Sequence, residues 1–120
     1  MFGGAFARAK AAGLGTTLHF AEMPPAAGGD DDAALLTLLS FAPDRLGHVI
    51  HVSEPVRAEI AARRLPLELC LTCNIKLKMD PVVSAHGEHH FRHWWADKSC
   101  PIVLCVCGPC QSRLWLAWTG

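Results

Sequence analysis

The feature that most constrains the fold of this chain is an alternation of short apolar runs with segments of helical pattern. Four runs are typical of buried strands, and they cover residues 16–20, 45–52, 67–72 and 101–105. Helical patterns lie between them at 33–39, 53–65 and 86–95, after a first helix at 5–12 that Gly13 closes. Such an alternation predicts an α/β fold of parallel βαβ units, which amounts to half of an eightfold barrel or a small open sheet.

Local signals define where these helices begin. Three aspartates, residues 30–32, precede the helix at 33–39 and bring carboxylates to the positive end of its dipole, so we interpret them as a cap and not as a metal site. Ser53 is a suitable N-cap and Pro55 suits the first turn of the next helix. That helix places Val56, Ile60 and Leu65 on one buried face.

Composition excludes several classes of function. A length of 120 residues with 51% hydrophobic content suits one small domain. Eleven basic and eleven acidic residues cancel, so neither nucleic acid nor an anionic membrane is an expected partner. No run approaches the ~20 apolar residues of a membrane span. Six cysteines lie close together between 70 and 110, and we predict reduced, mostly buried thiols in a soluble, cytoplasmic protein.

Ionisable residues stand where two predicted strands end. His19 and Glu22 end the first strand and His48 follows the second, about 29 residues later, a spacing that one βαβ unit fills. Taken singly, His19 and Glu22 are more typical of a surface pair, and His48 is more typical of a structural histidine that makes a hydrogen bond. Their occurrence at successive strand ends, where barrel enzymes keep their chemistry, favours metal-assisted hydrolysis with a carboxylic acid as proton donor.

Five ordered segments make the pattern specific: residues 19–24, 44–48, 67–74, 89–91 and 101–105. Together they resemble the adenosine deaminase family, in the adenosine deaminase-like branch that acts on N6-methyl-AMP, over about residues 6–105. The resemblance implies a metal-dependent hydrolase with a (β/α)8 TIM barrel, of which residues 1–105 are about four C-terminal βα units. It also implies a small-molecule substrate, a 6-aminopurine nucleoside or nucleoside monophosphate (adenosine, AMP or N6-methyl-AMP), which is converted to inosine or IMP.

The same resemblance implies roles for single residues. His19 corresponds to a zinc ligand, Glu22 to the acid that protonates the purine ring nitrogen, and His48 to the group that orients or deprotonates the attacking water. The family's first-strand His-x-His pair is absent, and Val106-Cys107-Gly108 stands in place of its Thr-Asp-Asp. Only one of four protein zinc ligands remains, so we expect poor zinc binding and little or no deaminase activity from this chain alone. Two unpaired strand edges predict self-association.

Residues 106–120 form a second region, in which the resemblance stops and which we predict does not belong to the fold. Cys107-Gly108-Pro109-Cys110 is similar to the dithiol motif of thioredoxins, although only ten residues follow it. A structural zinc module could combine this pair with Cys70 and Cys73, or use His89, His90 and His93. We favour solvated helix histidines over that second zinc site, because the order His-Glu-x-x-His is absent.

Overall fold

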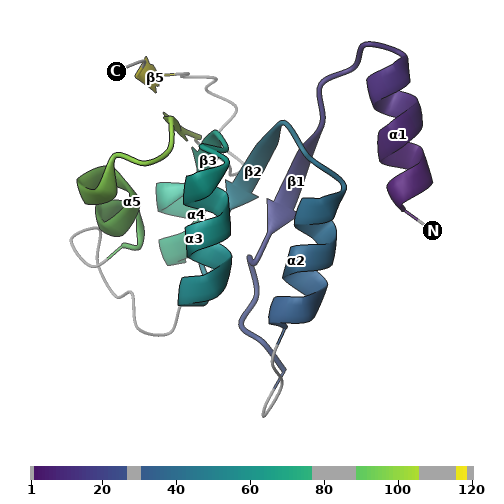
Figure 1. Ribbon diagram of the computed structural model, residues 1–120. Coiled ribbons are helices and arrows are strands. Elements are labelled where there is room, and N and C mark those ends of the chain that lie inside the picture. The colour runs from purple at the N-terminus through teal and green to yellow at the C-terminus, as the bar shows by residue number, and fades with distance from the viewer. Residues whose placement is uncertain (1, 27–30, 77–88, 106–115, 119–120) are drawn as a thin grey trace.

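A computed structural model describes residues 2–26, 31–76, 89–105 and 116–118. Helices and strands alternate along the chain (Figure 1): α1 Gly3–Ala11, β1 Thr17–Phe20, α2 Asp32–Ser40, β2 Arg45–His48, α3 Glu54–Ala62, β3 Leu67–Leu69, α4 Leu71–Lys76, α5 Phe91–Asp97, β4 Ile102–Leu104 and β5 Leu116–Trp118. The order of the strands in the sheet is β1-β2-β3-β4-β5. Because β1 to β4 are all parallel, the predicted α/β fold of parallel βαβ units is confirmed.

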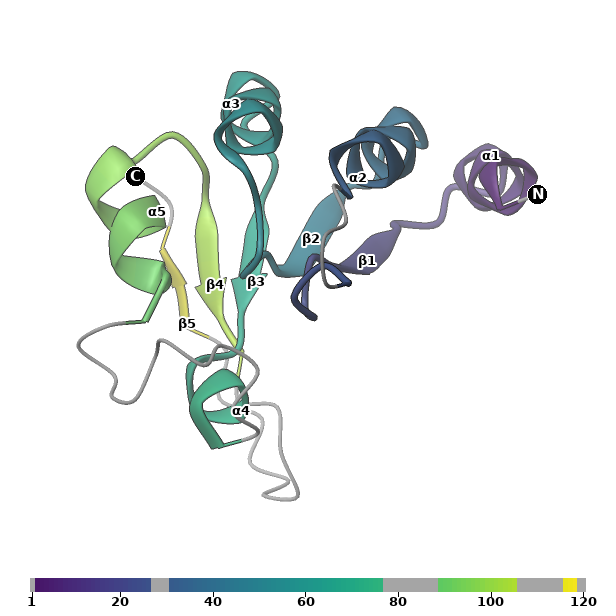
Figure 2. The same cartoon turned by 90° about the horizontal axis from the view of Figure 1, so that it is seen from below.

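The two faces of the sheet differ in character. In the parallel register Leu18 lies beside Leu46, and Leu46 beside Leu67, so one face is apolar. The helices α2 and α3 lie on one side of the sheet and α4 on the other (Figure 2). A single core joins the strands, α2, α3 and α5; its buried members are Phe20, Leu35, Leu39, Leu46, Val49, Val56, Ile60, Leu67, Leu69, Trp94, Cys100 and Ile102.

The opposite face carries polar residues at alternate positions. His19 pairs with Gly47, and Gly47 with Glu68, so these three positions share one face. Glu68 accepts a hydrogen bond from the Thr17 hydroxyl at 3.1 Å and forms an ion pair with Arg45 at 3.0 Å. This face is therefore the one that brings ionisable groups together, and the period of two along each strand explains why.

Two predicted strands are shorter than the sequence indicates. The second strand ends at His48, because the positive φ angles of His48 and Val49, 67° and 52°, turn the chain out of the extended conformation. The third strand ends at Leu69, and Leu71 begins α4. The backbone N–H of Asn74 donates to the Cys70 carbonyl oxygen at 3.1 Å. Both strands thus end early in favour of tight turns at the carboxyl edge of the sheet.

The helix signals are confirmed in part. Ser53 caps α3 by accepting a hydrogen bond from the Val56 amide, and Val56 and Ile60 are buried. Leu65 lies beyond the end of α3, although it packs against the core. At α2, Asp32 stands in the first turn as predicted, whereas the N-cap Asp31 makes no side-chain capping bond. Asp31 and Asp32 therefore bring carboxylates to the start of α2, as predicted, while Asp30 lies outside the described residues.

The far edge of the sheet differs from expectation. We expected the outer edge of β4 to lack a partner, but β5 pairs with it in antiparallel orientation, Leu104 opposite Leu116. The division of the chain at residue 105 stays a prediction, and Cys107 and Cys110 lie outside the described residues. Cys70 and Cys100 are buried, as predicted for structural thiols. In the described part of the chain, no helix has the length and apolarity to cross a membrane.

Candidate active site

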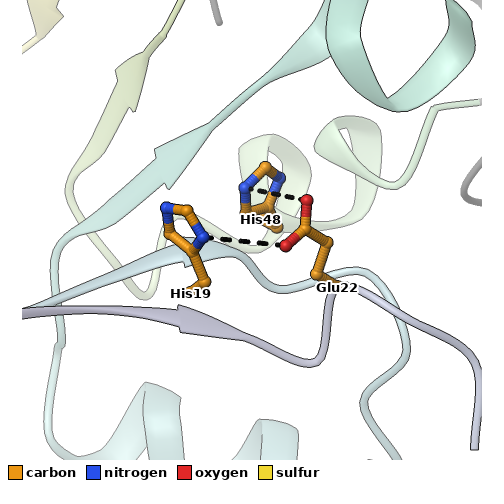
Figure 3. A group of neighbouring side chains, drawn as sticks. All are labelled: His19, Glu22 and His48. Atoms are coloured by element: carbon orange, nitrogen blue, oxygen red, sulfur yellow. Dashed lines mark ion pairs between the residues drawn. The ribbon is translucent and has the colours of Figure 1, made fainter. Parts of the chain in front are cut away.

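The three predicted site residues converge at the carboxyl ends of β1 and β2 (Figure 3). His19 lies within β1, Glu22 follows that strand, and His48 is the last residue of β2. The Glu22 carboxylate lies beside both rings, with Oε1 at 3.3 Å from His48 Nε2 and Oε2 at 3.7 Å from His19 Nδ1. The rings meet edge to face, with centroids 5.0 Å apart. The carboxylate is therefore within reach of both imidazoles.

An unusual backbone turn aims His48 at Glu22. Strict alternation along β2 would place His48 on the apolar face beside Phe20, its neighbour in β1. The positive φ of His48 breaks the alternation, and the ring reaches Glu22 instead. His90 stabilises this turn, since its Nε2–H donates to the His48 carbonyl oxygen at 2.7 Å. The hydrogen bond from His90 thus stabilises the strained backbone conformation of His48 and Val49.

Gly47 leaves room for the His19 ring. A Cβ atom at this position would lie 3.3 Å from the Leu18 carbonyl oxygen and 3.5 Å from His19 Cδ2. A larger side chain would press on the ring and on the backbone of β1. The glycine therefore permits the close approach of β1 and β2 beside the site.

A buried polar layer lies behind His48. Asn74 on α4 stands between two rings, with its Oδ1 at 3.0 Å from His48 Nδ1 and its Nδ2 at 3.2 Å from His89 Nε2. The first amide of α5, that of Phe91, donates to His89 Nδ1 at 3.1 Å. His48, Asn74 and His89 are each at most 3% exposed. Loss of one member would leave buried polar atoms unsatisfied, at a cost of about 1–3 kcal/mol.

The donor set fits a transition metal. His19, Glu22 and His48 each offer one ligand atom, and these atoms lie within 4.8 Å of one another. Nitrogen and carboxylate oxygen bind zinc at about 2.0–2.2 Å, so ligand atoms on one tetrahedral ion stand roughly 3.3–3.5 Å apart. The separations of 3.3 and 3.7 Å involve different oxygens of Glu22, so small side-chain movements would bring one ligand atom from each residue onto a single ion. This group could hold a metal ion.

Exposure distinguishes the two histidines. The His19 side chain is 78% exposed, so a metal ion on it would be open to further ligands and to water. The His48 side chain is 4% exposed and held by Asn74. A ring fixed in this way is better suited to a residue that must keep one orientation than to an exposed metal ligand.

Comparison with known proteins identifies the family. The chain matches no protein-family model. It is 34% identical over 108 residues to N6-methyl-AMP deaminase of Danio rerio, a match that covers 85% of this chain and 28% of the relative. The chain belongs to the adenosine deaminase-like family. It spans about a quarter of the length of the curated relatives that it matches.

Solved structures of this family share the fold. An ADAL–IMP complex has 30% sequence identity and a TM-score of 0.68, with 82% of this chain and 26% of that chain covered. An Arabidopsis ADAL complexed with GMP has 30% identity and a TM-score of 0.69, with 83% of this chain and 27% of that chain covered. The chain therefore has the fold of the corresponding part of an adenosine deaminase-like barrel.

Sequence reasoning missed the buried layer. We expected solvated histidines on a helix, but His89 and His90 are 1% and 8% exposed and precede α5, so that interpretation is wrong for both. His93 on α5 is exposed, as expected. Asn74 had no predicted role. Two signals could have identified them. Asn74 is a side-chain amide soon after a strand, and His89 and His90 are adjacent histidines before a helix, both in segments that already carried the family resemblance.

Proposed function

We propose that this chain carries catalytic residues of a zinc-dependent hydrolytic deaminase that acts on a 6-aminopurine nucleoside or nucleoside monophosphate. The observation that supports it most directly is the convergence of His19, Glu22 and His48 at adjacent strand ends. The relatives are N6-methyl-AMP deaminases, and similar solved structures are complexes with IMP and GMP. A purine nucleoside monophosphate is thus the proposed class of substrate, with N6-methyl-AMP placed before AMP and adenosine.

In this proposal each residue has one task. His19 holds zinc, which polarises and acidifies a water molecule when it is bound. Glu22, as a carboxylic acid, donates a proton to the purine ring nitrogen. His48 stands 3.3 Å from Glu22 and either accepts a proton from the attacking water or orients that water by donating a hydrogen bond. Loss of the amino or methylamino group and gain of oxygen complete the hydrolysis.

The proposal assigns the chain alone a minor activity. By the family resemblance, it holds one of four protein ligands for zinc, and a catalytic zinc normally has at least three. A chimera overcomes this difficulty: residues 6–105 replace the corresponding segment of the Danio rerio relative, which supplies the remaining barrel. We expect the chimera to hydrolyse N6-methyl-AMP, measured by the release of methylamine.

Single substitutions in the chimera test the roles. E22Q is expected to lower kcat by about 10²- to 10⁴-fold, since it removes a general acid, and H48Q by a similar factor. H19A is expected to lower the zinc content, measured by elemental mass spectrometry. H93Q is the matched control, because His93 is an exposed histidine on α5 and should leave both quantities unchanged. A chimera that retains full activity with E22Q would contradict the proposal.

A cytoplasmic location is part of the same proposal. The Cys100 thiol is buried and lies 3.7 Å from the Ile60 carbonyl oxygen, a contact in which the thiol is the donor. Burial raises the pKa of this thiol, which keeps it protonated and slow to oxidise. A reduced thiol in the core suits a reducing compartment. Fluorescence microscopy of a tagged chain should show a diffuse cytoplasmic signal, and a secretory pattern would contradict this part.

A further inference from the structure

The buried chain of side chains behind His48 has only one consistent direction of hydrogen bonds. It begins at the Phe91 amide and continues through His89, Asn74 and His48 to Glu22. A backbone N–H can only donate. His89 Nδ1, at 3.1 Å from the Phe91 nitrogen, must therefore be an acceptor and cannot carry a proton.

The next link follows from the chemistry of imidazole. A neutral ring carries one proton, so His89 bears it on Nε2 and donates it to the side chain of Asn74, 3.2 Å away. The amide atom that receives this bond must be the oxygen. With nitrogen in that place, both ring nitrogens of His89 would have to accept, which neutral imidazole cannot do. A half-turn of the Asn74 amide satisfies the network, and the oxygen and nitrogen of an amide are assigned on this basis.

The structure directs Asn74 Oδ1 at His48 and Nδ2 at His89, and the half-turn exchanges them, so the amide nitrogen faces His48. In this orientation the amide N–H takes the place of Oδ1, which lies 3.0 Å from His48 Nδ1, and donates to that ring nitrogen, which leaves the proton of the ring on Nε2. That Nε2–H points at Glu22 Oε1, 3.3 Å away. Each of the four links in the chain now joins one donor to one acceptor. Because the intervening groups are at most 3% exposed, water cannot easily exchange with these bonds.

We propose that Asn74 and His89 are positioning residues, which use the Phe91 amide as a fixed donor to hold His48 as the Nε2–H tautomer. This proposal rests on the proposed function for the role of His48. It decides between the two roles given there, acceptance of the water proton and orientation of the water. A ring held in this tautomer presents a donor to Glu22 and to the water beside it. His48 therefore orients the attacking water and does not accept its proton at Nε2.

Nitrogen NMR of the imidazole rings tests the tautomer directly. The complete chain, labelled with ¹⁵N, is studied well above the ordinary imidazole pKa of about 6.5. We expect Nε2 of both His48 and His89 to give protonated-type signals and Nδ1 of both to give unprotonated-type signals. A protonated Nδ1 on His48 in the unsubstituted chain would overturn the proposal, and this result needs no variant and no enzymatic activity.

A near-isosteric substitution tests the relay itself. Asn74→Asp keeps the shape of the side chain, but both carboxylate oxygens can only accept. His89 keeps its Nε2–H, whereas His48 is expected to move its proton to Nδ1, so its two nitrogen signals exchange character. His93→Gln is the matched control and should leave the His48 signals unchanged, because His93 is exposed on α5. An unchanged His48 tautomer in folded N74D would also overturn the proposal.

The two proposals can fail separately. An inactive chimera with the expected His48 tautomer would reject the deaminase function and retain the relay. An active chimera in which His48 carries its proton on Nδ1 would reject the relay and retain the function.

Discussion

At the scale of single residues, one carboxylate joins the residues that precede β1 and β2. Asp44 precedes β2, and its Oδ2 accepts bonds from the Thr16 amide at 2.7 Å and the Thr16 hydroxyl at 2.8 Å. These two bonds hold the pKa of the Asp44 carboxyl below its ordinary value of 3.8. A lowered pKa in the folded state means that the stabilisation is complete above 3.8 and is lost as the pH falls through the folded-state value.

The variant D44N should therefore unfold at a lower urea concentration than the unsubstituted chain at pH near 7. The difference between the two midpoints should shrink as the pH falls below the ordinary carboxyl value of 3.8. Urea titrations followed by circular dichroism at several pH values measure it. E54Q is the control, since Glu54 has an 84% exposed side chain and a long 3.8 Å contact with Arg57. Equal midpoints for D44N and E54Q at neutral pH would contradict the prediction.

At the scale of elements, one serine joins the starts of two helices. Ser53 Oγ accepts from the Val56 amide at 3.4 Å, which caps α3, and donates to Asp32 Oδ2 at 2.7 Å, which ties it to the first turn of α2. The helices that cover the apolar face are thus linked at their positive ends. Because Asp32 lies near the N-terminus of α2, its charge also favours the dipole of that helix.

S53A should destabilise the chain by about 1–2 kcal/mol, the usual cost of a lost N-cap. Thermal or urea unfolding measures this loss. S40A is the matched control, because Ser40 is exposed and bonds only locally, to the Thr37 carbonyl at 2.6 Å. A loss in S53A no greater than in S40A would show that the cap does not contribute.

At the scale of the whole molecule, the sheet is open on the side of β1. Among the described strands, β1 pairs with β2 alone, while β5 covers the far edge of β4. Large apolar side chains flank this strand, since Leu14 is 62% and Met23 66% exposed. An uncovered edge beside apolar groups favours pairing with a second copy, so self-association stays our prediction.

Sedimentation velocity should show a mean mass that rises with protein concentration. The double variant L14K/M23K places charge on both sides of β1 and should weaken the association about tenfold, which is about 1.4 kcal/mol. L36K is the control, because Leu36 is 40% exposed but lies on α2. A monomer at all concentrations would reject the prediction, and an equal effect of L36K would show that general surface apolarity, not the edge, drives association.

Sequence alone determined the order of β1 to β4 and of the helices α1, α2, α3 and α5, but neither α4 nor β5, because hydrophobic period and helix capping are local properties. It also located His19, Glu22 and His48 at strand ends, since parallel strands finish at the same edge. Tertiary structure alone decided the direction of the His48 ring, the burial of Asn74 and His89, and the pairing of β5. His48 meets Asn74 across 26 residues and His90 across 42. Such distant polar contacts leave no periodic trace, and they exist only once the folded core excludes water around them.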